Sequence, residues 1–216
     1  MKITKLLPLV AALALALPFG ASAQFGSLKL PGGAAVPAPP SGGDLTGQNE
    51  SLVRGYVASG KEVLLANALM AEALGLKDQA ATARATSAAL TDGATKGNLE
   101  DANKAVSAST DAVAAALAKG PELDEKSKAT FQSGMARLGL GLVRYVQLRT
   151  PAQNFASGLK TASPLMLPRL AAGGYVVTTL PGSISSLGTA LKSATSYAKS
   201  HDIPVPQDAT QALSAL

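Results

Sequence analysis

The chain has 216 residues, of which 42 are alanine, and it contains no cysteine, no tryptophan and a single histidine. Without cysteine it cannot form a disulfide, a thiolate zinc site, an iron–sulfur cluster or a cysteine nucleophile. Aromatic residues make up 4% of the chain and the formal net charge is +5. The few aromatic residues disfavour base-stacking platforms, so we do not expect nucleic acid as a partner.

The first 23 residues have the three parts of a secretory signal peptide. Lys2 and Lys5 form a positive start, Leu6–Pro18 is an apolar run, and Ala21-Ser22-Ala23 is a small-residue end. The apolar run is shorter than the roughly 20 residues that span a bilayer, although a retained N-terminal anchor is the alternative. We expect an exported protein, periplasmic or extracellular, with cleavage near Ala23-Gln24 and a net charge lowered to +3.

Residues 24–47 are rich in proline and glycine, which is typical of a flexible, disordered tether. The segment contains one P-x-x-P pattern, Pro37 to Pro40, so a proline-rich recognition segment is the alternative. The rest of the chain, 48–216, is expected to form a single α-helical domain.

From residue 48 onward Ala, Leu, Lys, Glu and Gln dominate and runs of β-branched residues are rare, which favours helix. Gly75, Gly120-Pro121 and Thr150-Pro151 are expected to end helices. The fold class predicted is all-α, a bundle of about five to seven helices with small-residue packing between them. Seven expected helices cover 48–74, 77–90, 99–118 with Asn98 as N-cap, 123–148, 152–162, 168–180 and 183–199, and a last short helix is expected at 208–216.

The helix expected at 123–148 is apolar over most of its circumference, which predicts a position in the centre of the bundle. Gly134, Gly139 and Gly141 lie inside it. Each glycine costs roughly 1 kcal/mol relative to alanine in a helix interior. This cost indicates close approach of neighbouring helices, with a flexible central region as the alternative.

Charge is distributed unevenly along the chain. Between Asp44 and Glu125 there are 12 acidic and 7 basic residues, whereas between Lys126 and His201 there are nine basic residues and no acidic one. Three interpretations follow: pairing between acidic and basic helices, contact with an anionic lipid or envelope surface, or contact with an acidic protein or polymer. The candidate anionic-surface contacts are Lys126, Arg137, Arg144, Arg149, Lys160 and Arg169.

Residues 170–191 contain no charged residue. Because Pro181-Gly182 divides this segment, we expect a buried helical hairpin, and a membrane-inserting hairpin is the alternative. Tyr175–Thr179 has β propensity, but a lone strand would have no partner, so we expect it to be helical.

The sequence indicates no catalytic, cofactor-binding or metal-binding residue. His201 lies between Ser200 and Asp202, but adjacent residues do not converge as a catalytic triad requires. We expect His201 to cap the end of a helix. The acidic pairs Glu100-Asp101 and Asp124-Glu125 open predicted helices and lack the spacing of a calcium loop.

A bundle rich in alanine and glycine can leave an apolar cleft for a lipid or another apolar molecule. The same residues serve equally as core, which is the alternative interpretation. The candidate cleft residues are Met70, Met135, Leu138, Leu142, Tyr145, Met166 and Tyr175.

We therefore expect an exported, non-enzymatic helical-bundle protein with a binding or structural role at the cell envelope or outside the cell. Its partner would be an anionic lipid or envelope surface, an apolar small molecule or another protein. The alternative is a membrane-active or membrane-associated protein that uses segment 170–191 and the basic C-terminal half.

Overall fold

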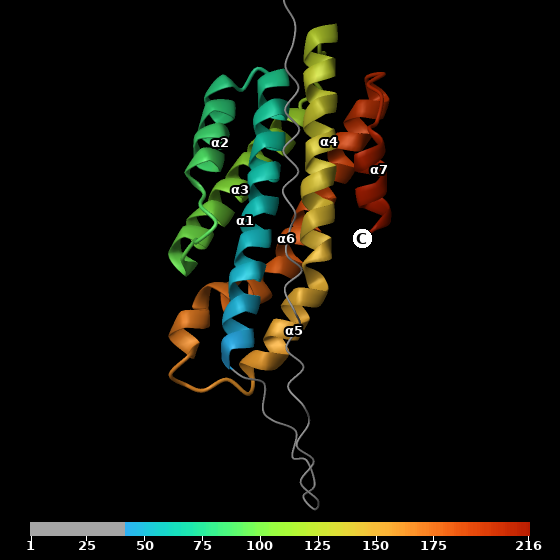
Figure 1. Ribbon diagram of the computed structural model, residues 1–216. Helices are drawn as coiled ribbons and strands as arrows, with labels where there is room; N and C mark the ends of the chain where they lie inside the picture. Colours follow the sequence, from blue (N-terminus) through green and yellow to red (C-terminus); the bar gives the residue numbers. More distant parts are fainter. Residues whose placement is uncertain (1–41) are drawn as a thin grey trace, which may run out of the picture. The chain divides into compact units, whose positions relative to one another are not determined.

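The computed structural model describes residues 42–216, with side chains from Leu45 onward. The predicted signal peptide and residues 24–41 of the predicted tether lie outside the described residues. Within 42–216 every regular element is a helix, so the all-α prediction is confirmed (Figure 1). The helices are α1 (Gly42–Ala73), α2 (Lys77–Ala89), α3 (Lys96–Leu117), α4 (Glu125–Gln147), α5 (Arg149–Leu159), the 3-10 helix η1 (Leu167–Leu170), α6 (Ala171–Ser200) and α7 (Gln207–Ser214).

Helix α1 begins at Gly42, so the part of the predicted tether from residue 42 to residue 47 is helical. Leu45, on this first turn, is buried. It packs over Gly158 of α5, where a Cβ atom would overlap the leucine side chain. This packing stabilises a helical turn that glycine-rich sequence alone disfavours.

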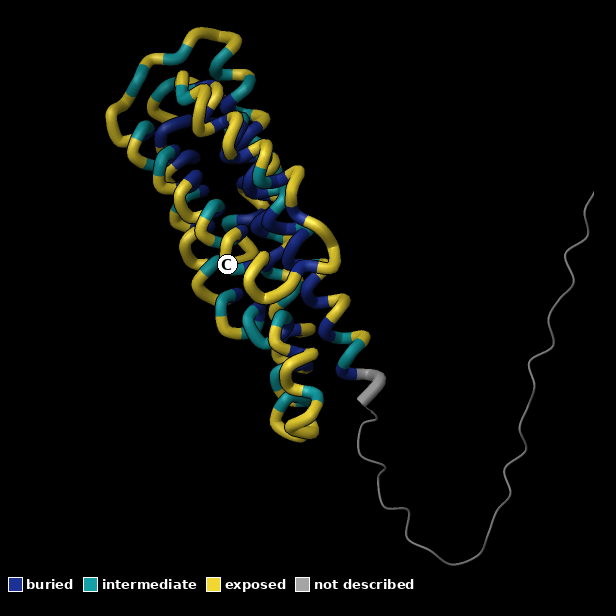
Figure 2. Tube along the Cα trace, turned by 90° about the vertical axis from the view of Figure 1, so that its left-hand side faces the viewer, coloured by how far each residue is buried: buried dark blue, intermediate teal, exposed yellow. Residues whose placement is uncertain are grey.

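Helices α1 and α4 form the centre of the bundle and pack more extensively against each other than any other pair. Figure 2 shows the buried residues as a continuous interior within the helical part. A Cβ added at Gly134 would lie 2.6 Å from Met70 Cγ, and one at Gly141 would lie 2.9 Å from Val63 Cγ2. Glycine is therefore required where α4 touches α1, and the predicted close approach of helices is confirmed.

Helix α6 is one continuous helix of 30 residues with Pro181 inside it, so the predicted hairpin and the break between residues 180 and 183 are wrong. Proline removes the hydrogen bond to the carbonyl of Val177 and costs about 3 kcal/mol in a helix interior. Leu180, Ile184 and Leu187 are buried on both sides of Pro181. Packing of this face against the core offsets the proline penalty.

Several helix ends differ from the sequence-based expectation. The N-cap of α3 is Thr95 rather than Asn98: the Thr95 Oγ1 accepts the Asn98 N–H, and the Asn98 Oδ1 accepts the Thr95 N–H. This reciprocal pair satisfies two donors at the helix start. The helix expected to stop before Thr150-Pro151 does stop there, since α4 ends at Gln147. Pro151 itself lies in the first turn of α5, where an intrahelical N–H bond is not needed.

Candidate functional site

The candidate apolar cleft residues lie in the core. Met70, Met135, Leu138, Leu142 and Tyr145 are almost completely buried, and Met166 and Tyr175 are partly buried and pack against the core. The void that touches Tyr145 measures about 10 Å³, roughly the size of one water probe. These side chains therefore fill the core, which is the alternative to a ligand cleft.

Two of the buried tyrosines form a pair between α1 and α4. The rings of Tyr56 and Tyr145 meet edge to face with centroids 5.1 Å apart. Burial raises the pKa of Tyr56 to about 12 and also raises the pKa of Tyr145 well above the ordinary value. Both phenols are protonated at neutral pH and are unsuited to act as bases or nucleophiles there.

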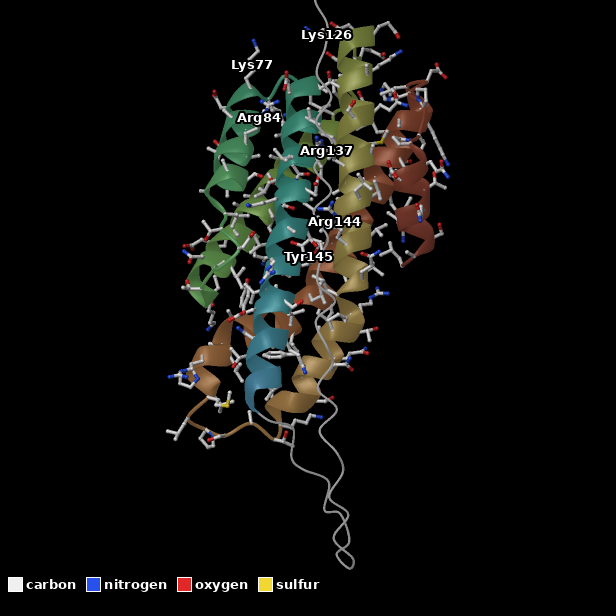
Figure 3. All side chains as sticks on the ribbon, viewed as in Figure 1. Lys77, Arg84, Lys126, Arg137, Arg144 and Tyr145 are labelled. Carbon is white, nitrogen blue, oxygen red and sulfur yellow. The ribbon has the colours of Figure 1, made fainter. Side chains whose placement is uncertain are left out.

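The six candidate anionic-surface residues fall into two groups. Arg137 and Arg144 of α4 each form an ion pair with Glu62 of α1, at 3.1 and 3.4 Å. Figure 3 shows both arginines on the side of α4 that borders α1. These ion pairs join α4, from the basic part of the chain, to α1, from the acidic part. The other four, exposed and without an ion pair within the described residues, are Lys126, Arg149, Lys160 and Arg169.

His201 lies at the C-cap of α6, as expected. Its Nδ1 is 2.9 Å from the carbonyl oxygen of Tyr197, and its ring stacks on the Tyr197 ring at 4.0 Å. Ser200 Oγ also donates to that carbonyl, at 2.9 Å. Ser200 Oγ and His201 Nδ1 also lie 3.0 Å apart. Both groups bind the carbonyl oxygen of Tyr197 in the last turn of α6, which is a capping arrangement.

No group of three or more His, Cys, Asp or Glu side chains within the described part of the chain is arranged to hold a metal ion. The uncharged segment 170–191 belongs to the end of η1 and the first two thirds of α6, and its large aliphatic side chains face the core. Among the described helices, none has the length and apolar character needed to cross a membrane.

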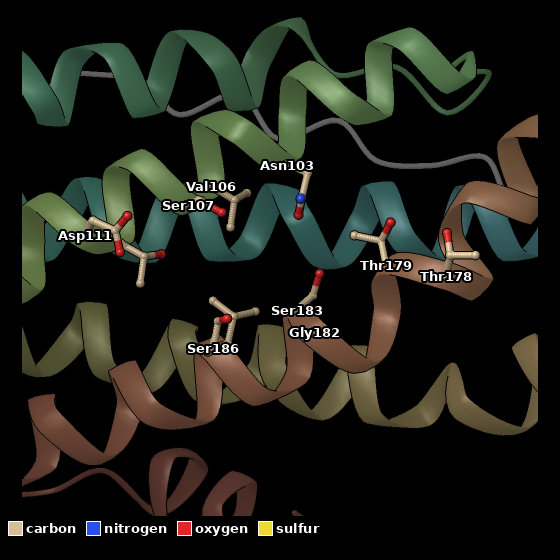
Figure 4. A pocket seen from close by; sticks show the side chains of 11 residues that line it. Asn103, Val106, Ser107, Asp111, Thr178, Thr179, Gly182, Ser183 and Ser186 are labelled. Atoms are coloured by element: carbon tan, nitrogen blue, oxygen red, sulfur yellow. The ribbon is translucent and has the colours of Figure 1, made fainter.

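An open groove lies between α3 and α6, with a volume of about 420 Å³ (Figure 4). Val106 and Leu187 are buried beneath it, while hydroxyl groups from the two helices form most of its walls. It is thus an apolar-floored groove with polar walls. The lining residues are Asn103, Val106, Ser107, Thr110, Asp111, Thr178, Thr179, Gly182, Ser183, Ser186 and Leu187.

A tyrosine of α1 forms hydrogen bonds with the central polar groups of the groove. Tyr56 Oη donates to Asn103 Oδ1 at 3.3 Å and lies 3.2 Å from Ser183 Oγ. The phenol therefore connects a side chain of α3 to one of α6 across the groove. This network fixes the Asn103 amide before any ligand binds.

Other polar groups of the groove have no partner in the protein. The hydroxyls of Ser107, Thr179 and Ser186 make no hydrogen bond to any described residue, and the exposed carboxylate of Asp111 forms no ion pair there. No lysine or arginine lines the groove. Its charge is negative at the Asp111 end, and its hydroxyls both donate and accept.

Sequence reasoning missed this groove because serine and threonine on a helix usually face solvent and carry no motif. A signal was present in the spacing. Asn103, Ser107 and Thr110 on one helix, and Thr179, Ser183 and Ser186 on the other, each follow an i, i+4, i+7 pattern. Such a pattern of small polar residues marks one helix face.

A second, more apolar groove of about 280 Å³ lies between α5 and α6. Val177 and Pro181 of α6 line it on one side, and Arg149 and Ala152 of α5 line it on the other.

Comparison with known proteins gives no relative from which to infer function. The chain matches no protein-family model, and neither a curated protein nor a solved structure is significantly similar to it. The fold and the groove define a class: an all-α bundle with an open polar groove between two helices.

Proposed function

We propose that the protein is an exported, non-enzymatic binding protein of the cell envelope or the extracellular space. It holds a polar, amine-bearing ligand in the groove between α3 and α6. The observation that supports this role is the row of unpaired hydroxyls ending at the unpaired carboxylate of Asp111.

The chemistry of the groove selects the ligand class. An ammonium group pairs with a carboxylate and donates to hydroxyl oxygens, whereas an anionic group would find no cation among the lining residues. The groove follows two helices and is open to solvent, which suits a narrow, extended molecule such as a polyamine or a lysine-containing peptide segment.

A binding role fits the titratable groups better than catalysis. The candidate bases and nucleophiles described above are capped, buried or paired: His201 binds a helix carbonyl and Tyr56 is held protonated by burial. Asp111 is exposed and has no neighbouring histidine or second carboxylate in the groove. General acid–base catalysis by two groups is therefore unsupported at this site.

The first test is an NMR titration of the protein with three probes: spermidine, sucrose and citrate. We expect spermidine to shift the amide signals of the groove residues, with weak shifts for sucrose and none for citrate. Asp111→Asn should weaken spermidine binding roughly tenfold, because a charge-assisted hydrogen bond is lost. Asp101→Asn is the matched control, since it removes the same charge from an exposed position of α3 outside the groove.

A second pair of variants tests the location of binding. Ser186→Leu places an aliphatic side chain in the groove, whereas Ser185→Leu places one on α6 outside the lining. We expect loss of binding for the first and unchanged binding for the second. Stronger shifts with citrate than with spermidine, or equal effects of the two members of either pair, would contradict the proposed site.

A further inference from the structure

The connection between α5 and α6, residues 160–170, presents apolar side chains to solvent. Leu165 is 89% exposed and Leu167 is 46% exposed. Among residues 45–216 four large apolar side chains are exposed, Leu140, Leu165, Leu167 and Leu216, and two of them lie in this connection. A concentration of exposed leucine marks a contact surface more often than a single exposed leucine does.

Positive charge brackets these leucines. Lys160 precedes them and Arg169 follows them, and both side chains are exposed. Neither forms an ion pair within the described part of the chain, in contrast to Arg137 and Arg144. The sequence contains no acidic residue between Lys126 and His201, so the positive charge of the connection has no acidic neighbour along the chain.

The connection has a fixed conformation that directs the leucines outward. The Met166 N–H donates to the Ser163 carbonyl at 2.9 Å, and the Arg169 N–H donates to the Met166 carbonyl at 2.9 Å. Met166 packs against the core and Leu170 is buried. These contacts hold the turn in one conformation, and in that conformation the side chain of Leu165 points to solvent.

The connection lies at one end of the bundle, beside the first turns of α1 (Figure 1). It is a convex turn that offers two leucines and two cations and no aromatic side chain. Protein interfaces usually depend on tryptophan, tyrosine or arginine anchors that fill a pocket, and of these residue types the turn has Arg169 alone. Shallow insertion into a fluid surface needs no pocket, and aliphatic side chains with flanking cations are the composition that binds anionic membranes.

We propose that residues 160–169 form an interfacial anchor for a bilayer that contains anionic lipid. Leu165 and Leu167 enter the boundary between headgroups and acyl chains, and Lys160 and Arg169 contact the phosphate groups. This inference goes beyond the groove between α3 and α6, because it uses different residues and a different ligand chemistry. It also differs from a membrane-inserting hairpin, since α6 keeps its aliphatic face in the core.

The chain has no tryptophan, so one introduced indole reports on its own surroundings without background. The test compares Leu165→Trp with the control Leu140→Trp, which places the indole at an exposed position of α4. Each full-length variant is mixed with phosphatidylcholine vesicles that contain about 30% phosphatidylglycerol, and with pure phosphatidylcholine vesicles, at about 50 mM salt. Emission wavelength and quenching by lipids brominated in the upper acyl chain are measured.

We expect emission of the Leu165→Trp variant to shift to shorter wavelength and to be quenched, with anionic vesicles only, while the Leu140→Trp variant does not respond. Lys160→Gln with Arg169→Gln, in the Leu165→Trp background, should weaken binding roughly 25-fold, about fivefold for each cation. Lys192→Gln with Lys199→Gln is the matched control and should leave binding unchanged.

Three outcomes would overturn the proposal: no response of the Leu165→Trp variant to anionic vesicles, an equal response of both indoles, or equal binding to neutral vesicles. Self-association that is removed by Leu165→Ser, without vesicle binding, would assign the turn to a protein contact. None of these results bears on spermidine binding in the groove, so the two proposals fail separately.

Discussion

Asn49 of α1 accepts a hydrogen bond through its Oδ1 from the backbone N–H of Gly173, in the first turn of α6, at 2.8 Å. The first N–H groups of a helix have no intrahelical acceptor, and Asn49 supplies one from a residue 124 positions away in sequence. The bond is buried, and it holds the start of α6 against α1.

Substitution at this contact should destabilise the domain. A Cβ at Gly173 would lie 2.5 Å from Asn49 Oδ1 and 2.7 Å from Phe155 Cε1. We expect Gly173→Ala to lower the free energy of unfolding in urea by about 1–3 kcal/mol, because the core there is overpacked. Gly182→Ala is the control: no atom lies within 4 Å of its Cβ position, and alanine should raise helix stability by up to about 1 kcal/mol. Equal effects at both positions would contradict the assigned contact.

The short helix α7 should depend on Gly139. A Cβ at this position would lie 2.6 Å from the backbone carbonyl oxygen of Asp208, an atom that cannot rotate away. Gly139→Ala should therefore displace α7 from α4 and leave much of the remaining bundle folded. Amide hydrogen exchange should accelerate over residues 207–214 before it does so in α1. Uniform acceleration throughout the domain would show that α7 is not released locally.

Glu62 should stabilise α4 through both of its arginine partners. Glu62→Gln leaves Arg137 and Arg144 two helical turns apart without their shared carboxylate. We expect the free energy of unfolding to fall by about 1 kcal/mol at low salt and by less at about 0.5 M salt, because exposed ion pairs are weak and screened. The arginine variants Arg137→Gln and Arg144→Gln complete double-mutant cycles, which should give a coupling energy with Glu62 in each case. If the free energy of unfolding falls by the same amount at both salt concentrations, Glu62 stabilises the domain by packing and not by its charge.

The buried tyrosines should make stability sensitive to alkaline pH. The pKa of Tyr56 is raised from 10.0 to about 12, so the folded state retains a proton that the unfolded state loses. Stability from this group is fully present below pH 10 and is lost as the pH rises from 10 toward 12. Unfolding measured across this range should show the decline, and Tyr56→Phe should make it less steep. In a pH titration followed by phenolate absorbance, the Tyr56→Phe variant should show one fewer tyrosine that ionises above pH 10.

The sequence predicted those features of the fold that depend on local chemistry. Gly75 and Gly120 end helices and have positive φ values of 77° and 60°, a backbone region that glycine favours. The glycines of α4 predicted close helix contact because no local reason favours glycine inside a helix. The apolar residues of α4 cover most of its circumference, and this pattern predicted that α4 lies in the centre of the bundle.

Features that depend on tertiary contact were not predictable in the same way. Pro181 reads as a helix end in sequence, but burial on both sides of it keeps α6 continuous. A stripe such as Met135, Leu138 and Leu142 is identical whether it lines a cleft or fills a core, so only packing decides. Sequence also did not reveal that Glu62 meets two arginines that are 75 and 82 positions away.

The proline in α6 has a mechanical consequence. Pro181 has no N–H to donate to the carbonyl oxygen of Val177, so one backbone hydrogen bond of α6 is missing there. Helices bend most readily at such a position. On one side of it lie η1 and the leucine-bearing turn, and on the other lie the contacts of Tyr197 with Phe131 of α4 and of Gly188 with Leu216. Bending of α6 is therefore easiest at Pro181, which lines the groove between α5 and α6 and is followed by Gly182 of the groove between α3 and α6, so a bend there would change the shape of both grooves.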